Sequence, residues 1–147
     1  MDAAALFLLL AGFVIGLGAV TVIELHGFLA RKSLYWTEAT IKTHKVTKPL
    51  IWIGLFTALV GGVLFYRNEG LTLIPILHLI TLTPLVLNGL FLTFVVSPYL
   101  LKQEREGKID LLPQSLQTKI IISFVLSVGG WWGNLLLLVI YLTLGRQ

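Results

Sequence analysis

The sequence predicts an all-α integral membrane protein in which four spanning helices form an up-down bundle. Apolar residues make up 56% of the 147 residues and charged residues only 12%, whereas a soluble domain carries about 25% charge. The apolar residues fall into four long runs, and spanning segments must be helical because lipid offers no partner to bare backbone polar groups. We therefore expect a single transmembrane domain over residues 1–147.

The four apolar runs predict spans at approximately residues 3–30, 47–66, 73–101 and 119–144. A spanning helix needs roughly 20 mostly apolar residues. The first run follows the acidic Asp2 and is too long for the apolar part of a secretory signal peptide, so we expect a retained helix. The third run is long and contains Pro75 and Pro84, which predict an irregular outer end.

Lysine and arginine are concentrated in two of the connecting segments, residues 31–49 and 102–119. Because positive residues in short loops favour the cytoplasmic side, both segments are expected in the cytoplasm and both termini outside. The net charge of +4 is then explained by the basic residues that orient the protein in the membrane. We expect no nucleic-acid partner, because the aromatic residues lie inside the apolar runs rather than among the bases. A multi-pass protein of a prokaryotic plasma membrane or an internal membrane is predicted.

The first basic segment carries signals for helix extension. Thr37 suits a helix N-cap and Glu38 the first turn after it, so the second helix is expected to begin near Glu38, ahead of its apolar part. With the first helix continuing past Arg31, the two helices form a cytoplasmic hairpin whose tip lies near Tyr35 and Trp36. These aromatic side chains suit the headgroup zone.

His26 and His44 are the candidate cofactor ligands that follow from this hairpin. Each lies nine residues from Tyr35, so both are expected about 14 Å from the tip at 1.5 Å per residue. Imidazole binds haem iron, zinc and copper, and the chain has no cysteine. One interpretation is a site for b-type haem or another metal on this pair, with Arg31, Tyr35 and Trp36 near the haem propionates, for electron transfer or haem sensing. The alternative is that these histidines hydrogen-bond headgroups or a neighbouring helix.

Two further ionisable residues lie within the apolar runs. Glu24 lies about 10 Å inside Arg31 by helix rise, and a carboxyl group at such depth usually faces a bundle interior or a water-filled cavity. We interpret it either as the ion-pair partner of Lys45 or Lys48, or as a proton carrier. His78 lies near the outer end of the third span, too far in depth from the other histidines to share an iron with them.

Asn88 and Asn134 are expected at similar depth near the middle of the membrane. An interhelical hydrogen bond between the two amides is the economical interpretation, and a substrate pathway is the alternative. Trp131 and Trp132 also lie at mid-depth, whereas tryptophan normally marks the interfaces. Because glycines surround them, we expect the indoles to fill space against a neighbouring helix, a lipid or a flat cofactor.

Small residues form two stripes that predict close helix packing. The stripes consist of Gly12 and Gly16 on the first helix, and Gly54, Ala58 and Gly61 on the second. These faces are expected to pack within the chain, or to form a homodimer or the contact with a larger membrane complex.

The sequence contains no Walker loop, dinucleotide fingerprint, HExxH or GxSxG motif, so an enzyme is not the favoured interpretation. Three functional hypotheses remain. The first is the haem protein described above, and the second is a non-enzymatic accessory subunit of a larger membrane complex. The third is a small transporter or channel that uses Glu24 and Asn88.

Overall fold

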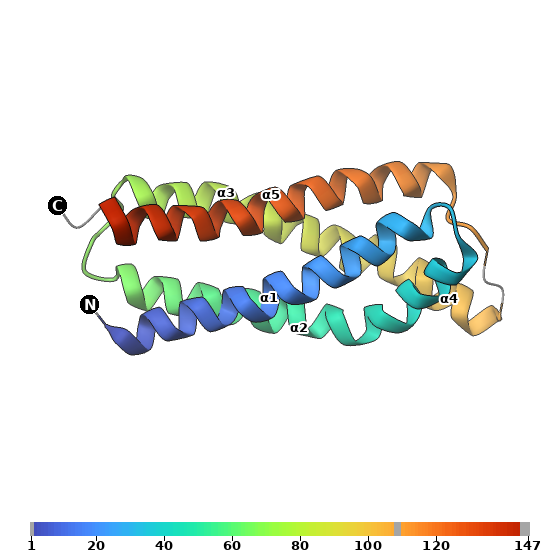
Figure 1. Ribbon diagram of the computed structural model, residues 1–147, viewed down its shortest axis with the longest axis horizontal. Coiled ribbons are helices and arrows are strands. Elements are labelled where there is room, and N and C mark those ends of the chain that lie inside the picture. The colour runs from blue at the N-terminus through green and yellow to red at the C-terminus, as the bar shows by residue number, and fades with distance from the viewer. Residues whose placement is uncertain (1, 108–109, 145–147) are drawn as a thin grey trace.

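The protein is a bundle of long helices (Figure 1). A computed structural model describes residues 2–107 and 110–144, and it is entirely helical apart from turns and links over these residues. The elements in chain order are α1 (Ala3–Ala30), α2 (Leu34–Tyr66), α3 (Leu73–Phe91), the π-helical η1 (Leu92–Val96), α4 (Ser97–Glu106) and α5 (Gln114–Leu144). Four helical stretches are long and apolar enough to cross a membrane, with α3, η1 and α4 counting as one. The prediction of four such helices is confirmed.

The helices run up and down along one long axis (Figure 1). The N-terminus, the α2–α3 turn and the end of α5 lie together at what we call the terminal end. The α1–α2 turn and the link between α4 and α5 lie at the opposite end, which we call the hairpin end. Along the bundle, α1 packs on α2 and α3 packs on α5, and α1 also contacts α5.

The two small-residue stripes face each other between α1 and α2. A Cβ atom added to Gly12 would lie 2.2 Å from the backbone nitrogen of Ala58, and one added to Gly54 would lie 2.4 Å from the backbone nitrogen of Gly16. Gly61 lies equally close to the backbone of Leu9. Only hydrogen fits at these positions, which lets the two backbones approach closely. Both stripes are therefore used within the chain, and a second copy would need another surface.

The α1–α2 turn differs from the prediction. α1 ends at Ala30, and α2 begins at Leu34 after Ser33. Thr37 lies inside α2, where its hydroxyl donates to the carbonyl oxygens of Ala30 and Ser33, both at 3.1 Å. The predicted N-cap at Thr37 is thus wrong, because this hydroxyl serves a carbonyl left unpaired at the end of α1.

The tip of the hairpin accordingly lies at Arg31–Ser33, not near Tyr35 and Trp36, and α1 does not continue past Arg31. The extension of the second helix ahead of its apolar part is confirmed and is longer than expected. It is stabilised by a buried stripe that includes Thr37 and Ile41, which pack inside the hairpin end.

The third apolar run is also irregular, but not at its outer end, where the prolines predicted it. Pro75 lies in the first turn of α3, where a helix needs no N–H donor from it. The distortion is the π-helical turn Leu92–Val96, directly ahead of Pro98. Proline has no N–H and its ring clashes with the preceding turn, so a widened turn at this point accommodates it.

Candidate functional site

Buried polar side chains gather at two cavities, one toward each end of the bundle. The hairpin-end cavity has a volume of about 70 Å³ and the terminal-end cavity about 320 Å³. Between them the core is apolar, with the rings of Phe13 and Trp131 packed edge to face at 6.1 Å. Leu85 belongs to the same buried cluster. We refer to Phe13, Leu85 and Trp131 as the apolar layer.

Glu24 and His44 both line the hairpin-end cavity. Their side chains are only 4% and 8% exposed. Oε1 of Glu24 and Nε2 of His44 form no hydrogen bond within residues 2–107 and 110–144. A buried polar atom left unpaired costs about 1–3 kcal/mol, and water relieves this cost where a polar cavity has room for it. The volume here is enough for a few water molecules.

Helix periodicity places these two groups on the buried faces of their helices. Glu24 follows Val20 by four residues and precedes Gly27 by three, and all three are buried on α1. His44 follows Thr40 by four residues, and both are buried on α2. Side chains three and four residues apart lie on the same helix face, so both ionisable groups point into the bundle.

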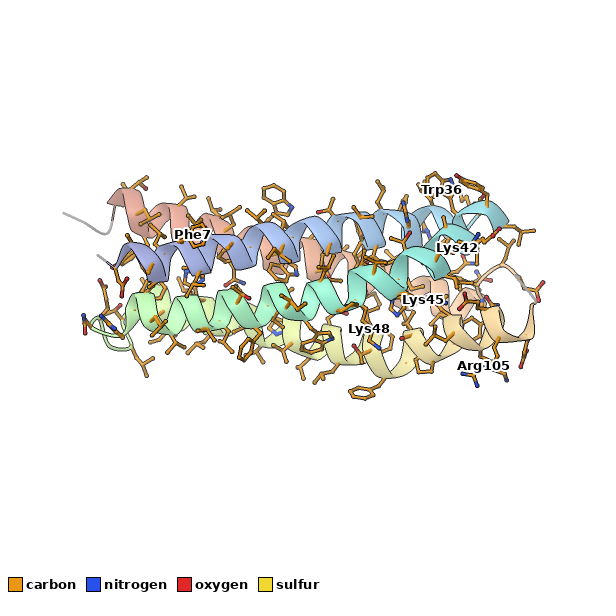
Figure 2. All side chains as sticks on the ribbon, turned by 90° about the horizontal axis from the view of Figure 1, so that it is seen from below. Phe7, Trp36, Lys42, Lys45, Lys48 and Arg105 are labelled. Carbon is orange, nitrogen blue, oxygen red and sulfur yellow. The ribbon has the colours of Figure 1, made fainter. Side chains whose placement is uncertain are left out.

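The predicted ion pair between Glu24 and a lysine of α2 is wrong. Lys45 Nζ instead lies 2.8 Å from Glu104 Oε1, and Lys48 Nζ donates to Ser97 Oγ at 3.2 Å. Both lysines therefore reach toward α4 (Figure 2). Lys48 still lines the hairpin-end cavity, so Glu24 has a cation nearby without a direct ion pair to it.

His26 does not join His44 at the cavity. The Gly12–Ala58 register, continued along both helices, brings position 26 level with position 44, as expected. The His26 ring, however, packs against Trp36 with centroids 5.2 Å apart, and His26 is not among the residues that line either cavity. The two histidines lie at similar depth, but their imidazole rings do not meet at one cavity.

The other residues expected around a haem also lie apart from the cavity. The Arg31 guanidinium stacks on Phe28 at 3.9 Å, and Tyr35 is 71% exposed. No group of three or more His, Cys, Asp or Glu side chains in the described part of the chain could hold a metal ion. A cavity of about 70 Å³ beside His44 has no room for a macrocycle, so the present arrangement does not fit haem between His26 and His44. The haem hypothesis itself stays a prediction.

Asn88 extends the Glu24 cluster toward the middle of the bundle. Its Nδ2 donates to Ser127 Oγ at 2.8 Å and to the Ser123 carbonyl at 3.2 Å. The same two serines of α5 lie beside the Glu24 carboxyl. The predicted hydrogen bond between Asn88 and Asn134 is therefore wrong, because each amide has its own partners on a neighbouring helix.

Asn134 and His78 form the polar wall of the terminal-end cavity together with Tyr66. His78 Nδ1 lies 2.8 Å from Asn134 Oδ1, and His78 Nε2 lies 3.1 Å from Tyr66 Oη. Asn134 Nδ2 donates to the Gly130 carbonyl, so Oδ1 is the acceptor and a neutral His78 carries its proton on Nδ1. Tyr66 O–H then donates to Nε2.

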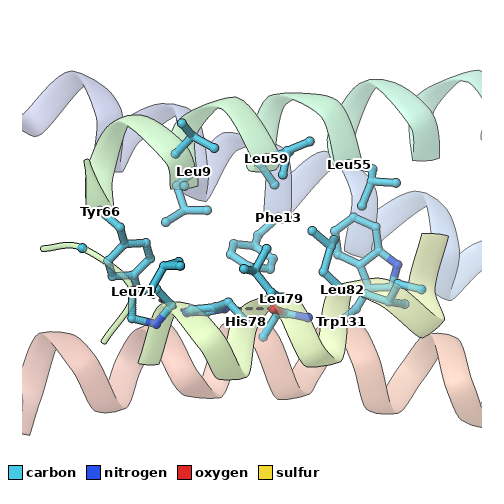
Figure 3. Close-up of a pocket in the computed structure, with 17 residues that line it drawn as sticks. Leu9, Phe13, Leu55, Leu59, Tyr66, Leu71, His78, Leu79, Leu82 and Trp131 are labelled. Atoms are coloured by element: carbon cyan, nitrogen blue, oxygen red, sulfur yellow. Dashed lines mark hydrogen bonds between the residues drawn. The ribbon is translucent and has the colours of Figure 1, made fainter. Parts of the chain in front are cut away.

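Tyr66 was not predicted as a site residue, although its position relative to His78 in the sequence indicated it. Tyr66 and His78 lie six residues on either side of Thr72, the residue that precedes α3. Equal distances from a turn place two residues at similar depth on antiparallel helices. Tyr66 lies at one end of the cavity and Trp131 at the other, with His78 between them (Figure 3).

The tryptophan pair is divided between the inside and the outside of the bundle. Trp131 is 3% exposed and fills the space that Gly16 leaves on α1, whereas Trp132 is 54% exposed. Of the three interpretations offered for these indoles, Trp131 fits packing against a neighbouring helix. Gly129 and Gly133 have no atom within 4 Å of an added Cβ in the described residues, so the room for Trp131 comes from α1.

Comparison with protein-family models, with curated proteins and with solved structures finds no match for this chain. Function is therefore inferred from the geometry of the two cavities. The hairpin-end cavity brings together an acid and an imidazole. The terminal-end cavity combines a large apolar volume with one neutral hydrogen-bonded chain.

Proposed function

We propose that the protein conducts protons across a membrane and that Glu24 and His44 are its proton-exchanging pair. The observation that carries the proposal is the pair of atoms without hydrogen-bond partners in the described bundle, Glu24 Oε1 and His44 Nε2, whose side chains line the same cavity. Ionisable residues within membrane spans are rare and mark ion pathways and proton relays built of Asp, Glu and His. This develops the transporter hypothesis and assigns Glu24 the role of proton carrier.

The proposed orientation places the hairpin end in the cytoplasm and both termini outside. Lys42, Lys45 and Lys48 lie near the hairpin end, and Arg105 lies there as well (Figure 2). Positive residues in such short segments favour the cytoplasmic side. Under this orientation the hairpin-end cavity lies toward the cytoplasm, so protons on that side reach His44 first.

The proposed route has two polar stretches with the apolar layer between them. From the hairpin end it passes from His44 to Glu24 and then to Ser127 and Asn88. Hydroxyl and amide groups hydrogen-bond water, and water molecules held beside them complete a path for protons. Apolar constrictions close such paths by excluding water, and we assign this role to the apolar layer.

Beyond the apolar layer the route continues along the second polar stretch. The chain from Asn134 through His78 to Tyr66 runs toward the terminal end. There Tyr141 O–H donates to Glu69, an exposed carboxylate at the α2–α3 turn. An imidazole accepts a proton on one nitrogen and releases one from the other, so His78 is suited to exchange protons with Tyr66 and with water in the cavity, while the Asn134 amide holds the ring by accepting from Nδ1–H.

The proposal is tested with the full chain reconstituted in liposomes that contain a pH-sensitive dye. A potassium gradient with valinomycin supplies the driving voltage, and empty liposomes give the background leak. Glu24→Gln preserves the shape of the side chain but removes its titration, so we expect flux to fall by about 100-fold or more. Glu38→Gln is the matched control, because Glu38 pairs with Lys42 on the surface of the hairpin. Undiminished flux in Glu24→Gln would remove Glu24 from the mechanism.

A further inference from the structure

The terminal-end cavity has the size of a small-molecule site. Its volume of about 320 Å³ falls at the lower end of the range of ligand pockets, about 300–1,000 Å³. Ligand pockets are mostly apolar with a few polar groups that orient the ligand, and this cavity follows that pattern. Its walls are leucine side chains and the rings of Phe13, Tyr66 and Trp131, and its polar wall is the Tyr66–His78–Asn134 chain.

The cavity has a buried floor and an exposed rim. Phe13 and Trp131 on the floor are 6% and 3% exposed, whereas Val63 and Leu71 on the rim are 64% and 75% exposed. The rim residues belong to α2 and the α2–α3 turn, and Leu79 of α3 is exposed on the other side. In a membrane this rim faces the acyl chains, so a ligand reaches the cavity sideways from the bilayer.

The polar wall carries no formal charge when His78 is neutral. In that state Tyr66 O–H donates to His78 Nε2, and the phenol oxygen accepts from a ligand hydroxyl. When His78 is protonated, its Nε2–H donates to the phenol oxygen, and the Tyr66 hydroxyl is released to donate to a ligand carbonyl. One side chain thus recognises either a hydroxyl or a carbonyl oxygen at the same place.

We propose that the terminal-end cavity binds the head group of a lipid-soluble quinone or its quinol. The head group is a flat neutral ring that carries carbonyl oxygens in one form and hydroxyl groups in the other. The ring lies between Tyr66 and Phe13, with one oxygen on Tyr66 Oη, and the hydrocarbon tail leaves over the rim at Val63 and Leu71. This proposal concerns binding alone, and it stands whether or not the bundle conducts protons.

Binding is measured on the purified full chain in mild detergent with decylubiquinone as the probe. A bound quinone quenches the fluorescence of a nearby indole by accepting an electron from its excited state, and Trp131 lines the same cavity at the end away from Tyr66. A background in which Trp36, Trp52 and Trp132 are replaced by phenylalanine leaves Trp131 as the reporter. We expect saturable quenching of Trp131. On the wild-type chain, which needs no substitutions, we expect the probe to raise the unfolding temperature with the same concentration dependence.

Two matched glycine variants locate the site. Gly62 lines the cavity, and an added Cβ there meets only the end of Leu9 at 3.8 Å among the described residues. Gly62→Leu therefore fills the cavity without displacing backbone, and we expect it to abolish saturable quenching. Gly133→Leu, on the open face of α5, should leave binding unchanged.

The hydrogen bond to the ring is tested by Tyr66→Phe with the reduced probe, decylubiquinol, in the unfolding-temperature assay, because the phenol oxygen accepts from a ligand hydroxyl while His78 is neutral. Removing one hydrogen bond of about 0.5–1.5 kcal/mol should weaken binding by roughly twofold to tenfold. Linear quenching that is equal in the parent and Gly62→Leu backgrounds would mean that the probe only partitions into detergent, which overturns the proposal. Equal protection by 1-decanol would also overturn it, because the cavity would then take any lipid chain and not a ring.

Discussion

Glu24 of α1 and His44 of α2 line the same cavity at the hairpin end, both more than nine-tenths buried. Neither Glu24 Oε1 nor His44 Nε2 has a hydrogen-bond partner in the described chain. Two such groups at one cavity oppose stability, since buried polar atoms normally find partners. Arrangements that oppose stability are typical of functional sites, and this relationship is the basis of the proposed proton exchange.

The first prediction separates function from stability at Glu24. We expect Glu24→Gln to unfold in detergent at the same temperature as the wild type or a higher one, because the amide keeps the shape of the side chain and carries no charge. Proton flux in the same variant should be lost. Unfolding temperatures are measured by circular dichroism, and a large decrease for Glu24→Gln would indicate a structural role for the carboxylate instead.

The apolar layer gives the second prediction. Leu85→Ala removes side-chain volume between the two polar stretches, so we expect faster proton leak in liposomes together with a stability loss of about 2–5 kcal/mol. Leu87→Ala is the control on the same helix, because Leu87 is 62% exposed. Leak that does not differ between the two variants would contradict the assignment of the layer as the closure of the path.

The third prediction concerns the α1–α2 contact. Gly12→Ala places a methyl group 2.2 Å from the backbone of Ala58, which no rotamer change relieves, so we expect destabilisation of about 1–3 kcal/mol. Gly18→Ala is the control, because an added Cβ there meets no described atom within 4 Å. That change should be neutral or stabilising by up to about 1 kcal/mol. Reversible unfolding by a denaturing detergent measures both, and equal effects would contradict the close approach.

The partners of the buried amides give the fourth prediction. Asn88→Ala and Ser127→Ala remove the two sides of one hydrogen bond, so their effects on unfolding free energy should couple by about 0.5 kcal/mol or more. Asn88→Ala and Asn134→Ala should be additive, because these amides have different partners. Coupling in the second pair and additivity in the first would restore the direct bond between the asparagines.

The fifth prediction addresses haem. Because His26 packs on Trp36 and the cavity at His44 has no room for a macrocycle, we expect a preparation from haem-replete cells to be colourless. The visible spectrum is recorded in the oxidised and dithionite-reduced states. A Soret band that disappears in both His26→Ala and His44→Ala would contradict this expectation and restore the haem hypothesis.

The sequence by itself determined the fold class and the positions of the four long helices, because the length of an apolar run and the exclusion of bare backbone from lipid are local properties. It also predicted that the second helix begins before its apolar part. The helix end at Ala30 was not predicted, since it depends on a bond from Thr37, which lies across the turn. Local capping preferences do not include such a contact.

Only the tertiary structure decided which buried polar groups meet. Spacing along a helix places Glu24, Asn88 and Asn134 in depth, but the rotation of each helix is set by its neighbours. The contact of Gly12 with Ala58 fixes α1 on α2, and with it the side chains that share a cavity. For this reason His44 lies with Glu24 and not with His26. The packing of α3 on α5 likewise places Asn134 with His78 and not with Asn88.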